Sequence, residues 1–255
     1  SRFKFVVFGT KKGEVTHQFK CAFMEHDPER LPIIDTNTLK MSVEQVKKFS
    51  PDTLSIMEFK NQRDVDITLS IYNDCPLLSE QVDDSWNIVF TQEFNMTSDS
   101  HLFLSKDQVT KSNSKIIQLW LRNDEKLGSR SIPSAIKNVI AQQIIDFLPL
   151  YEGKTIHEYD SFYSEPQYYI DLNKGIEKNR DKKLSSIMHP KVVFRALGQS
   201  GNERNCIAAV LPEGCFTGNS VYYSIYSDNF KEAEIFLFQS IFTSFIIDYL
   251  IRQKI

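Results

Sequence analysis

From Lys191 to Tyr226 the chain reads KVVFRALGQSGNERNCIAAVLPEGCFTGNSVYYSIY, and this stretch decides the fold class of the second half of the sequence. Short apolar runs rich in β-branched and aromatic residues favour strands. These runs are 192–194, 207–211 and 221–226. Polar, glycine-containing segments separate them and predict turns, at 198–202 and 213–215. The sequence therefore predicts a β-rich region after residue 150.

Helices are expected on both sides of this region. Ile132–Leu148 carries one apolar stripe with Pro133 in its first turn, and Pro149 is expected to end the helix. A long apolar segment, 231–252, predicts a closing helix. Gln239 and Asp248 interrupt its apolar run, so we interpret it as a buried helix and expect no membrane contact.

The first half alternates helical and extended patterns. Two apolar runs, 3–9 and 15–23, predict an N-terminal hairpin, and a chain that opens directly in a strand suggests that a segment precedes it. Ser42 with Gln45 fits a capping box, and Ser50-Pro51 marks the end of the helix that follows. We also expect a helix at 60–72, a strand at 86–91 and a loop at 105–114. The fold class predicted for the whole chain is α+β.

The composition of the chain constrains its function less than it constrains its fold. With 255 residues, 41% of them hydrophobic, the chain can bury a sizeable core. Its four cysteines are scattered without a Cys-x-x-Cys pair, which favours a reducing, cytoplasmic setting over a disulfide framework or a zinc site. The net charge of −3 argues against a generally basic DNA-binding surface, so any positive surface must be local.

One enzymatic interpretation is a metal-dependent nuclease. Asp52, Glu58 and Lys60 spell the carboxylate, carboxylate and lysine of magnesium-dependent DNA cleavage. Their spacing is too short for the two adjacent strands that usually present such groups. A helix end followed by surface residues is the simpler interpretation. The five histidines show no close ligand spacing that would suggest a metal site.

The loop between residues 195 and 205 carries side chains of the types that read base edges. Arginine pairs with guanine, and asparagine or glutamine with adenine. The candidates for DNA contact are Arg195, Gln199, Asn202, Arg204 and Asn205. An exposed polar turn explains the same residues. A local basic run, which includes Lys178, Arg180, Lys182 and Lys183, could contact phosphates or could be a solvated charged segment.

Pro149–His157 reads PLYEGKTIH, and this stretch resembles a signature of large type II (type IIG-like) restriction–modification methylases that methylate adenine N6. Residues 86–103 resemble the segment that precedes this signature in the family. Phe194-Arg195, Asn202-Glu203-Arg204 and Ala208–Pro212 are similar to its later segment, and 244–254 to the closing one. These matches cover most of the chain in the family's order.

The resemblance implies an α+β arrangement in which terminal strands of a methyltransferase sheet precede a mixed α/β specificity domain similar to that of Taq-type enzymes. It implies the last methyltransferase hairpin at 1–30, a helix-rich connecting region at 31–149 and a DNA target-recognition domain at 150–255. Lys154 and His157, within the signature, join the candidate DNA contacts.

The family's Asn-Pro-Pro-Tyr motif and its glycine-containing cofactor loop do not occur in this sequence. We therefore expect no catalysis and no cofactor in this chain. The parent protein would use S-adenosylmethionine, and magnesium if it also cleaves. The expected partners are double-stranded DNA and an upstream methyltransferase domain of the same polypeptide. A protein-docking domain, with 86–103 or the closing helix as its surface, remains an alternative.

Overall fold

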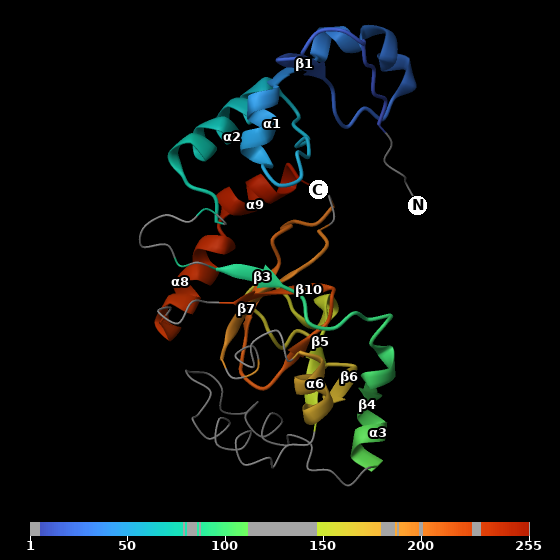
Figure 1. Ribbon diagram of the computed structural model, residues 1–255, viewed down its shortest axis with the longest axis vertical. Coiled ribbons are helices and arrows are strands. Elements are labelled where there is room, and N and C mark those ends of the chain that lie inside the picture. The colour runs from blue at the N-terminus through green and yellow to red at the C-terminus, as the bar shows by residue number, and fades with distance from the viewer. Residues whose placement is uncertain are drawn as a thin grey trace. The chain divides into compact units, whose positions relative to one another are not determined.

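The computed structural model describes residues 6–78, 80, 86, 88–111, 147–179, 187, 189–198, 201–225 and 231–254. They form two compact units, the first ending at Leu77 and the second running from Leu78 to Gln253 (Figure 1). Both units mix helices and strands, which confirms the α+β class.

The first unit contains β1 (Gln18–Cys21), the 3-10 helix η1 (Pro28–Asn37), β2 (Leu39–Ser42), α1 (Val43–Phe49) and α2 (Gln62–Asp74). Ser42 caps α1 through the predicted capping box with Gln45, and Ser50 ends it. The predicted helix at 60–72 is confirmed as α2, whose buried Val65 faces a core shared with Phe49 and Met57.

The predicted N-terminal hairpin is confirmed only in part: its second run, 15–23, contains β1, whereas the described residues of its first run form no strand. Residues 6–17 form no strand, and Phe8 is 79% exposed. Instead β1 pairs antiparallel with β2, beyond η1. The two strands bury Met41 and Leu39 against the helices, and this burial of apolar surface stabilises them. The exposed run at 6–9 lacks such stabilisation.

The second unit holds two four-stranded sheets. The first has the order β3-β10-β7-β8, all antiparallel, and consists of Val89–Thr91, Val221–Ile225, Lys191–Arg195 and Ala208–Leu211. The second has the order β4-β6-β5-β9 and consists of Leu104–Ser105, Tyr168–Asp171, Phe147–Tyr151 and Phe216–Thr217. The strands expected at 192–194, 207–211 and 221–226 are confirmed as β7, β8 and β10, and the one at 86–91 is shorter, as β3.

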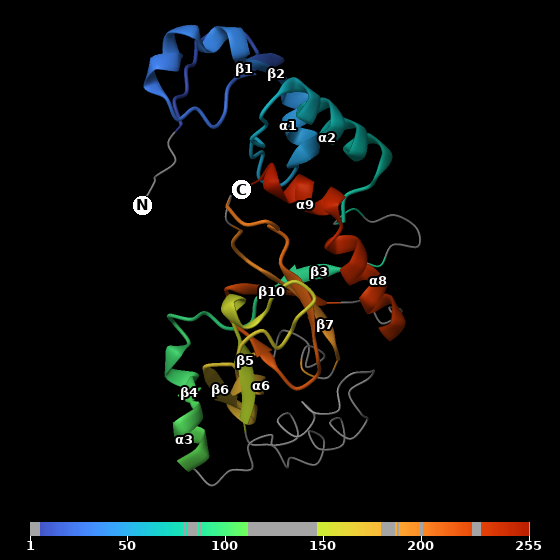
Figure 2. The same cartoon turned by 180° about the vertical axis from the view of Figure 1, so that it is seen from behind.

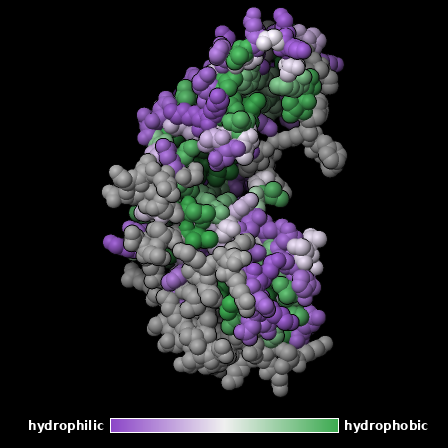
Figure 3. All heavy atoms as spheres, viewed as in Figure 1, coloured by the Kyte–Doolittle hydropathy of each residue, from purple (hydrophilic) through white to green (hydrophobic). Residues whose placement is uncertain are grey.

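Two helices and two single turns accompany this second sheet. They are η2 (Ser100–Leu102), α3 (Lys106–Lys111), η3 (Gly153–Thr155) and α6 (Leu172–Lys178). The prediction of a loop at 105–114 is wrong for 106–111, where α3 forms. Hydrogen bonds between Ser105 and Gln108 begin this helix. Hydrophilic side chains gather on the surface around α3 (Figure 3).

The predicted helix 132–148 lies outside the described residues up to position 146. Its last residues, Phe147 and Leu148, are strand rather than helix, because β5 is bonded to β6 on one side and β9 on the other. Pro149 lies inside β5 and ends no helix.

The predicted closing helix is two helices, α8 (Glu232–Phe242) and α9 (Phe245–Arg252), with 51° between them. Ser244 caps α9 by accepting a hydrogen bond from the N–H of Ile247. Among the described residues no single helix is long and apolar enough to cross a membrane, and α8 and α9 reach that length only when counted as one bent pair.

The core of the second unit has an ion pair at its centre. The Nζ of Lys191 lies 3.8 Å from a carboxylate oxygen of Glu93 and donates to the carbonyl of Cys215 at 2.9 Å. The same carboxylate oxygen accepts from the backbone and hydroxyl of Thr217. Outside this pair, alternating residues of β7 face opposite layers: Val193 packs between the sheets and Val192 against α8. Figure 2 shows α8 beside β7.

Candidate nucleic-acid interface

The polar loop before β8 is fastened to α9 by one carboxylate. An oxygen of Asp248 accepts hydrogen bonds from the backbone N–H groups of Asn205 at 2.7 Å and Cys206 at 2.8 Å. Burial by itself would raise the pKa of Asp248. The hydrogen bonds from Cys206, Arg252 and Asn205 outweigh it, and the pKa of this carboxyl lies below its usual range.

Arg252 completes the attachment one turn further along α9. Its Nε donates to the second oxygen of Asp248 at 3.0 Å. Its Nη2 donates to the carbonyls of Asn202, at 3.0 Å, and of Glu203. A buried aspartate and an arginine thus hold the loop backbone from 202 to 206 in one conformation.

The side chain of Arg204 is occupied by contacts with other residues of the chain. Its Nη2 donates to the carbonyl of Thr243, and its Nε lies 3.4 Å from a carboxylate oxygen of Glu158. The guanidinium lies over the ring of Phe245, 4.3 Å from the centroid. Because its side chain is only 14% exposed, Arg204 would have to give up these contacts to read a guanine. The geometry favours an anchoring role over the predicted base contact.

Three other candidates are also engaged inside the chain. Arg195 donates to the carbonyl of Ile156 at 2.6 Å and so joins β7 to the signature segment. Asn205 is buried, and its side-chain oxygen has no hydrogen-bond partner among the described residues. Lys178 forms an ion pair of 2.8 Å with Asp99. Arg195 and Asn205 therefore position the surface and do not form it, whereas Lys178 is exposed on it.

Lys154 and His157 are, with Lys178, the exposed members of the predicted set among the described residues. The Nζ of Lys154 lies 3.0 Å from the carboxylate of Glu152 and donates to Gln167 at 2.6 Å. His157 opens a loop, 157–163, and its ring packs 4.7 Å from that of Tyr163. Asn202 is half-buried. The remaining candidates, Arg180, Lys182, Lys183 and Gln199, lie outside the described residues.

The candidate residues predicted from the sequence do not include the aromatic residues of the loop 157–163. Tyr159, Phe162 and Tyr163 are all exposed, immediately after the signature. A signal was present, since three aromatic residues alternate with polar ones in a segment without helical or strand periodicity.

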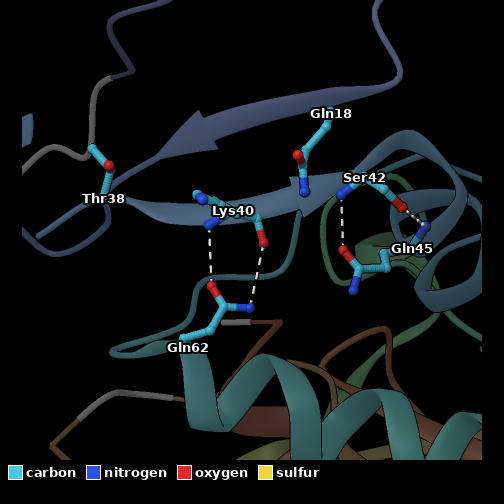
Figure 4. A pocket seen from close by; sticks show the side chains of 6 residues that line it. All are labelled: Gln18, Thr38, Lys40, Ser42, Gln45 and Gln62. Atoms are coloured by element: carbon cyan, nitrogen blue, oxygen red, sulfur yellow. Dashed lines mark hydrogen bonds between the residues drawn. The ribbon is translucent and has the colours of Figure 1, made fainter.

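The first unit carries a polar groove without a carboxylate (Figure 4). It is lined by amide, hydroxyl and ammonium groups, from Gln18, Thr38, Lys40, Ser42, Gln45 and Gln62. The Gln62 amide bonds both the N–H and the carbonyl of Lys40, at 3.1 Å and 3.4 Å. It thus occupies the free edge of β2 as a neighbouring strand would, which protects that edge from pairing.

The residues of the nuclease hypothesis lie in this unit as well. Asp52 and Lys60 are exposed, and Glu58 is half-buried between Met57 and Phe59. Within the described ranges, no group of three or more His, Cys, Asp or Glu side chains is arranged to hold a metal ion. The geometry gives the nuclease hypothesis no support.

Comparison with known proteins adds no assignment: no family model matches the chain, and neither does any curated protein.

Proposed function

We propose that this chain recognises double-stranded DNA as the target-recognition part of an S-adenosylmethionine-dependent adenine-N6 methyltransferase. One observation carries the proposal. The segments that resemble that family are far apart in sequence, yet hydrogen bonds join them in one unit. Arg195 bonds Ile156, and Arg252 bonds Asn202. This is the arrangement expected if the similar segments belong to one shared fold.

Within this proposal, the loop at 202–206, which Asp248 and Arg252 hold, is a rigid support. The exposed side chains near it make the DNA contact. Lys154 is placed to approach a phosphate, and the Arg180–Lys183 run supplies further positive charge. The overall charge of −3 then requires a local positive field. A catalytic domain on the other side of the DNA would share that field. S-adenosylmethionine would bind in that domain, as would magnesium if the parent protein cleaves DNA.

Binding to a fluorescent duplex, followed by anisotropy in a salt series, tests this proposal. We expect saturable binding at low salt that weakens as salt rises, since released counterions drive phosphate contacts. Lys154→Gln should weaken binding by a similar factor for every sequence, whereas Lys60→Gln, the matched control in the first unit, should have no effect. If no duplex binds even at low salt, the proposal is refuted.

A second candidate function, docking onto another protein domain, is favoured by the outer face of α8 and α9. Large apolar side chains are exposed there: Phe236, Leu237, Ile241, Phe245 and Ile246. Five large exposed apolar side chains on two consecutive helices favour an interaction surface. We propose that the upstream methyltransferase domain covers it. If so, the chain alone should self-associate in sedimentation, and F236S with I241S should make it monomeric without lowering its melting temperature. If the chain without these substitutions is already monomeric, this proposal is contradicted.

A further inference from the structure

The loop from His157 to Tyr163 presents aromatic rings to solvent. Tyr159 is 60% exposed, Phe162 48% and Tyr163 57%. Folding normally buries such side chains, because their removal from water is a main source of stability. An arrangement that leaves three of them outside on seven residues indicates a contact surface.

The loop is held rigidly in this conformation. The backbone N–H of His157 donates to the carbonyl of Asp160 at 2.7 Å, and that of Tyr159 to Ala208 in β8 at 2.9 Å. The hydroxyl of Tyr159 bonds Thr243 at 2.7 Å. Tyr159 has a φ of 60°, in the left-handed region that tyrosine rarely adopts. Contacts to β8 and to the α8–α9 junction therefore maintain a conformation that the local sequence disfavours.

The charged residues of the loop are used to build it. Glu158 faces Arg204, and Asp160 accepts the backbone N–H of Phe162 at 2.8 Å. Phe162 and Tyr163 remain exposed, and the His157 ring packs against that of Tyr163. The nearest exposed cation along the chain is Lys154, whose carbonyl accepts the hydroxyl of Ser164 at the end of the loop.

We propose that Phe162 and Tyr163 stack on the faces of bases in the recognised duplex, at a step that binding unstacks. This inference rests on the proposed DNA-recognition function and names the element that enters the duplex. Aromatic rings stack on any base, and apolar wedges from rigid elements open base steps in bound duplexes. Lys154 would hold the adjacent phosphate.

Permanganate oxidation of thymines in a bound duplex tests the inference, because only unstacked thymines react readily. We compare the wild-type chain with F162A/Y163A and with the control F8A, an exposed aromatic in the first unit. The double variant should weaken duplex binding about tenfold or more, as expected for lost base stacking. It should also abolish a thymine hyperreactivity that wild type and F8A both produce. Its melting temperature should match wild type, since both removed rings are exposed.

The outcomes separate the inference from the proposal beneath it. If wild type binds duplex and F162A/Y163A binds equally well, or if wild type binds without any reactive thymine, the aromatic loop does not stack on bases and DNA recognition still stands. If wild type binds no duplex, both fail.

Discussion

The backbone N–H of Cys206, two residues before β8, donates a 2.8 Å hydrogen bond to the carboxylate of Asp248 in α9. The same oxygen accepts from Asn205, and Arg252 holds the other one. These contacts join residues more than forty positions apart. The loop that the sequence predicts to contact bases therefore connects the start of the β8 segment to α9 and has a structural role.

Asp248→Asn should destabilise the chain by about 2 kcal/mol, because a charged acceptor of two backbone N–H groups and a guanidinium becomes neutral. The free energy of unfolding in urea measures this. Asp52→Asn, an exposed matched control, should change it by less than about 0.5 kcal/mol. Equal losses of unfolding free energy in the two variants would show that Asp248 does not stabilise the connection between the loop and α9.

The same carboxylate gives stability a pH dependence of known sign. The pKa of Asp248 is lowered in the folded chain, so its contribution is complete above the ordinary carboxyl pKa of about 3.9 and disappears as the pH falls through the folded-state value. Below pH 4, the stability difference between wild type and Asp248→Asn should therefore shrink. A difference that stays constant down to acid pH would contradict the assignment.

Arg204→Ala should lower the melting temperature and leave base preference unchanged. The substitution leaves the Thr243 carbonyl and Glu158 without their guanidinium partner and removes the ring contact to Phe245. A loss of about 2 kcal/mol is expected for such a partly buried set. Differential scanning calorimetry and duplex competition measure the two effects separately. A stable variant that tolerates any base at one position would restore the base-reading role.

Lys191→Met should cost about 3–5 kcal/mol, because it leaves the carboxylate of Glu93 buried without the ammonium. Lys191 is only 2% exposed. Lys154→Met, at an exposed ion pair in the same unit, should cost less than about 1 kcal/mol. Urea unfolding followed by circular dichroism checks both, and similar midpoints for the two variants would argue against a buried pair.

The cysteines should separate into reactive and silent groups. Burial raises the pKa values of Cys206 and Cys215 to about 12, so neither forms a thiolate at neutral pH. Cys75 is exposed. A thiol-specific reagent followed by peptide mass mapping should modify Cys75 in the native chain, and Cys206 and Cys215 only after denaturation. Immediate reaction of all of them would show that the core is open.

Local signals explain what the sequence could predict. The capping box of Ser42 and Gln45 needs only neighbouring residues, and so does the apolar run of β7. Ser105 and Gln108 carry a similar local signal, which the polar composition of the segment hid. Phe147 and Leu148 fitted a helical stripe, and only their pairing with distant strands makes them a strand.

The site depends even more on distant partners. Nothing in the residues around Arg204 distinguishes a base-reading arginine from an anchoring one, since Glu158, Thr243 and Phe245 are far away in the sequence. The break between α8 and α9 had a local signal, because serine favours helix N-caps and Ser244 follows an apolar run.

Selection of bound duplexes from a random-sequence DNA library, first at low and then at physiological salt, tests the central claim most directly. DNA recognition predicts one enriched motif that survives the salt step and is kept in Arg204→Ala wherever that variant is folded, and stacking by the aromatic loop predicts a weaker enrichment of the same motif in F162A/Y163A. Binding without any motif that vanishes as salt rises would contradict sequence recognition by this chain and leave only phosphate attraction.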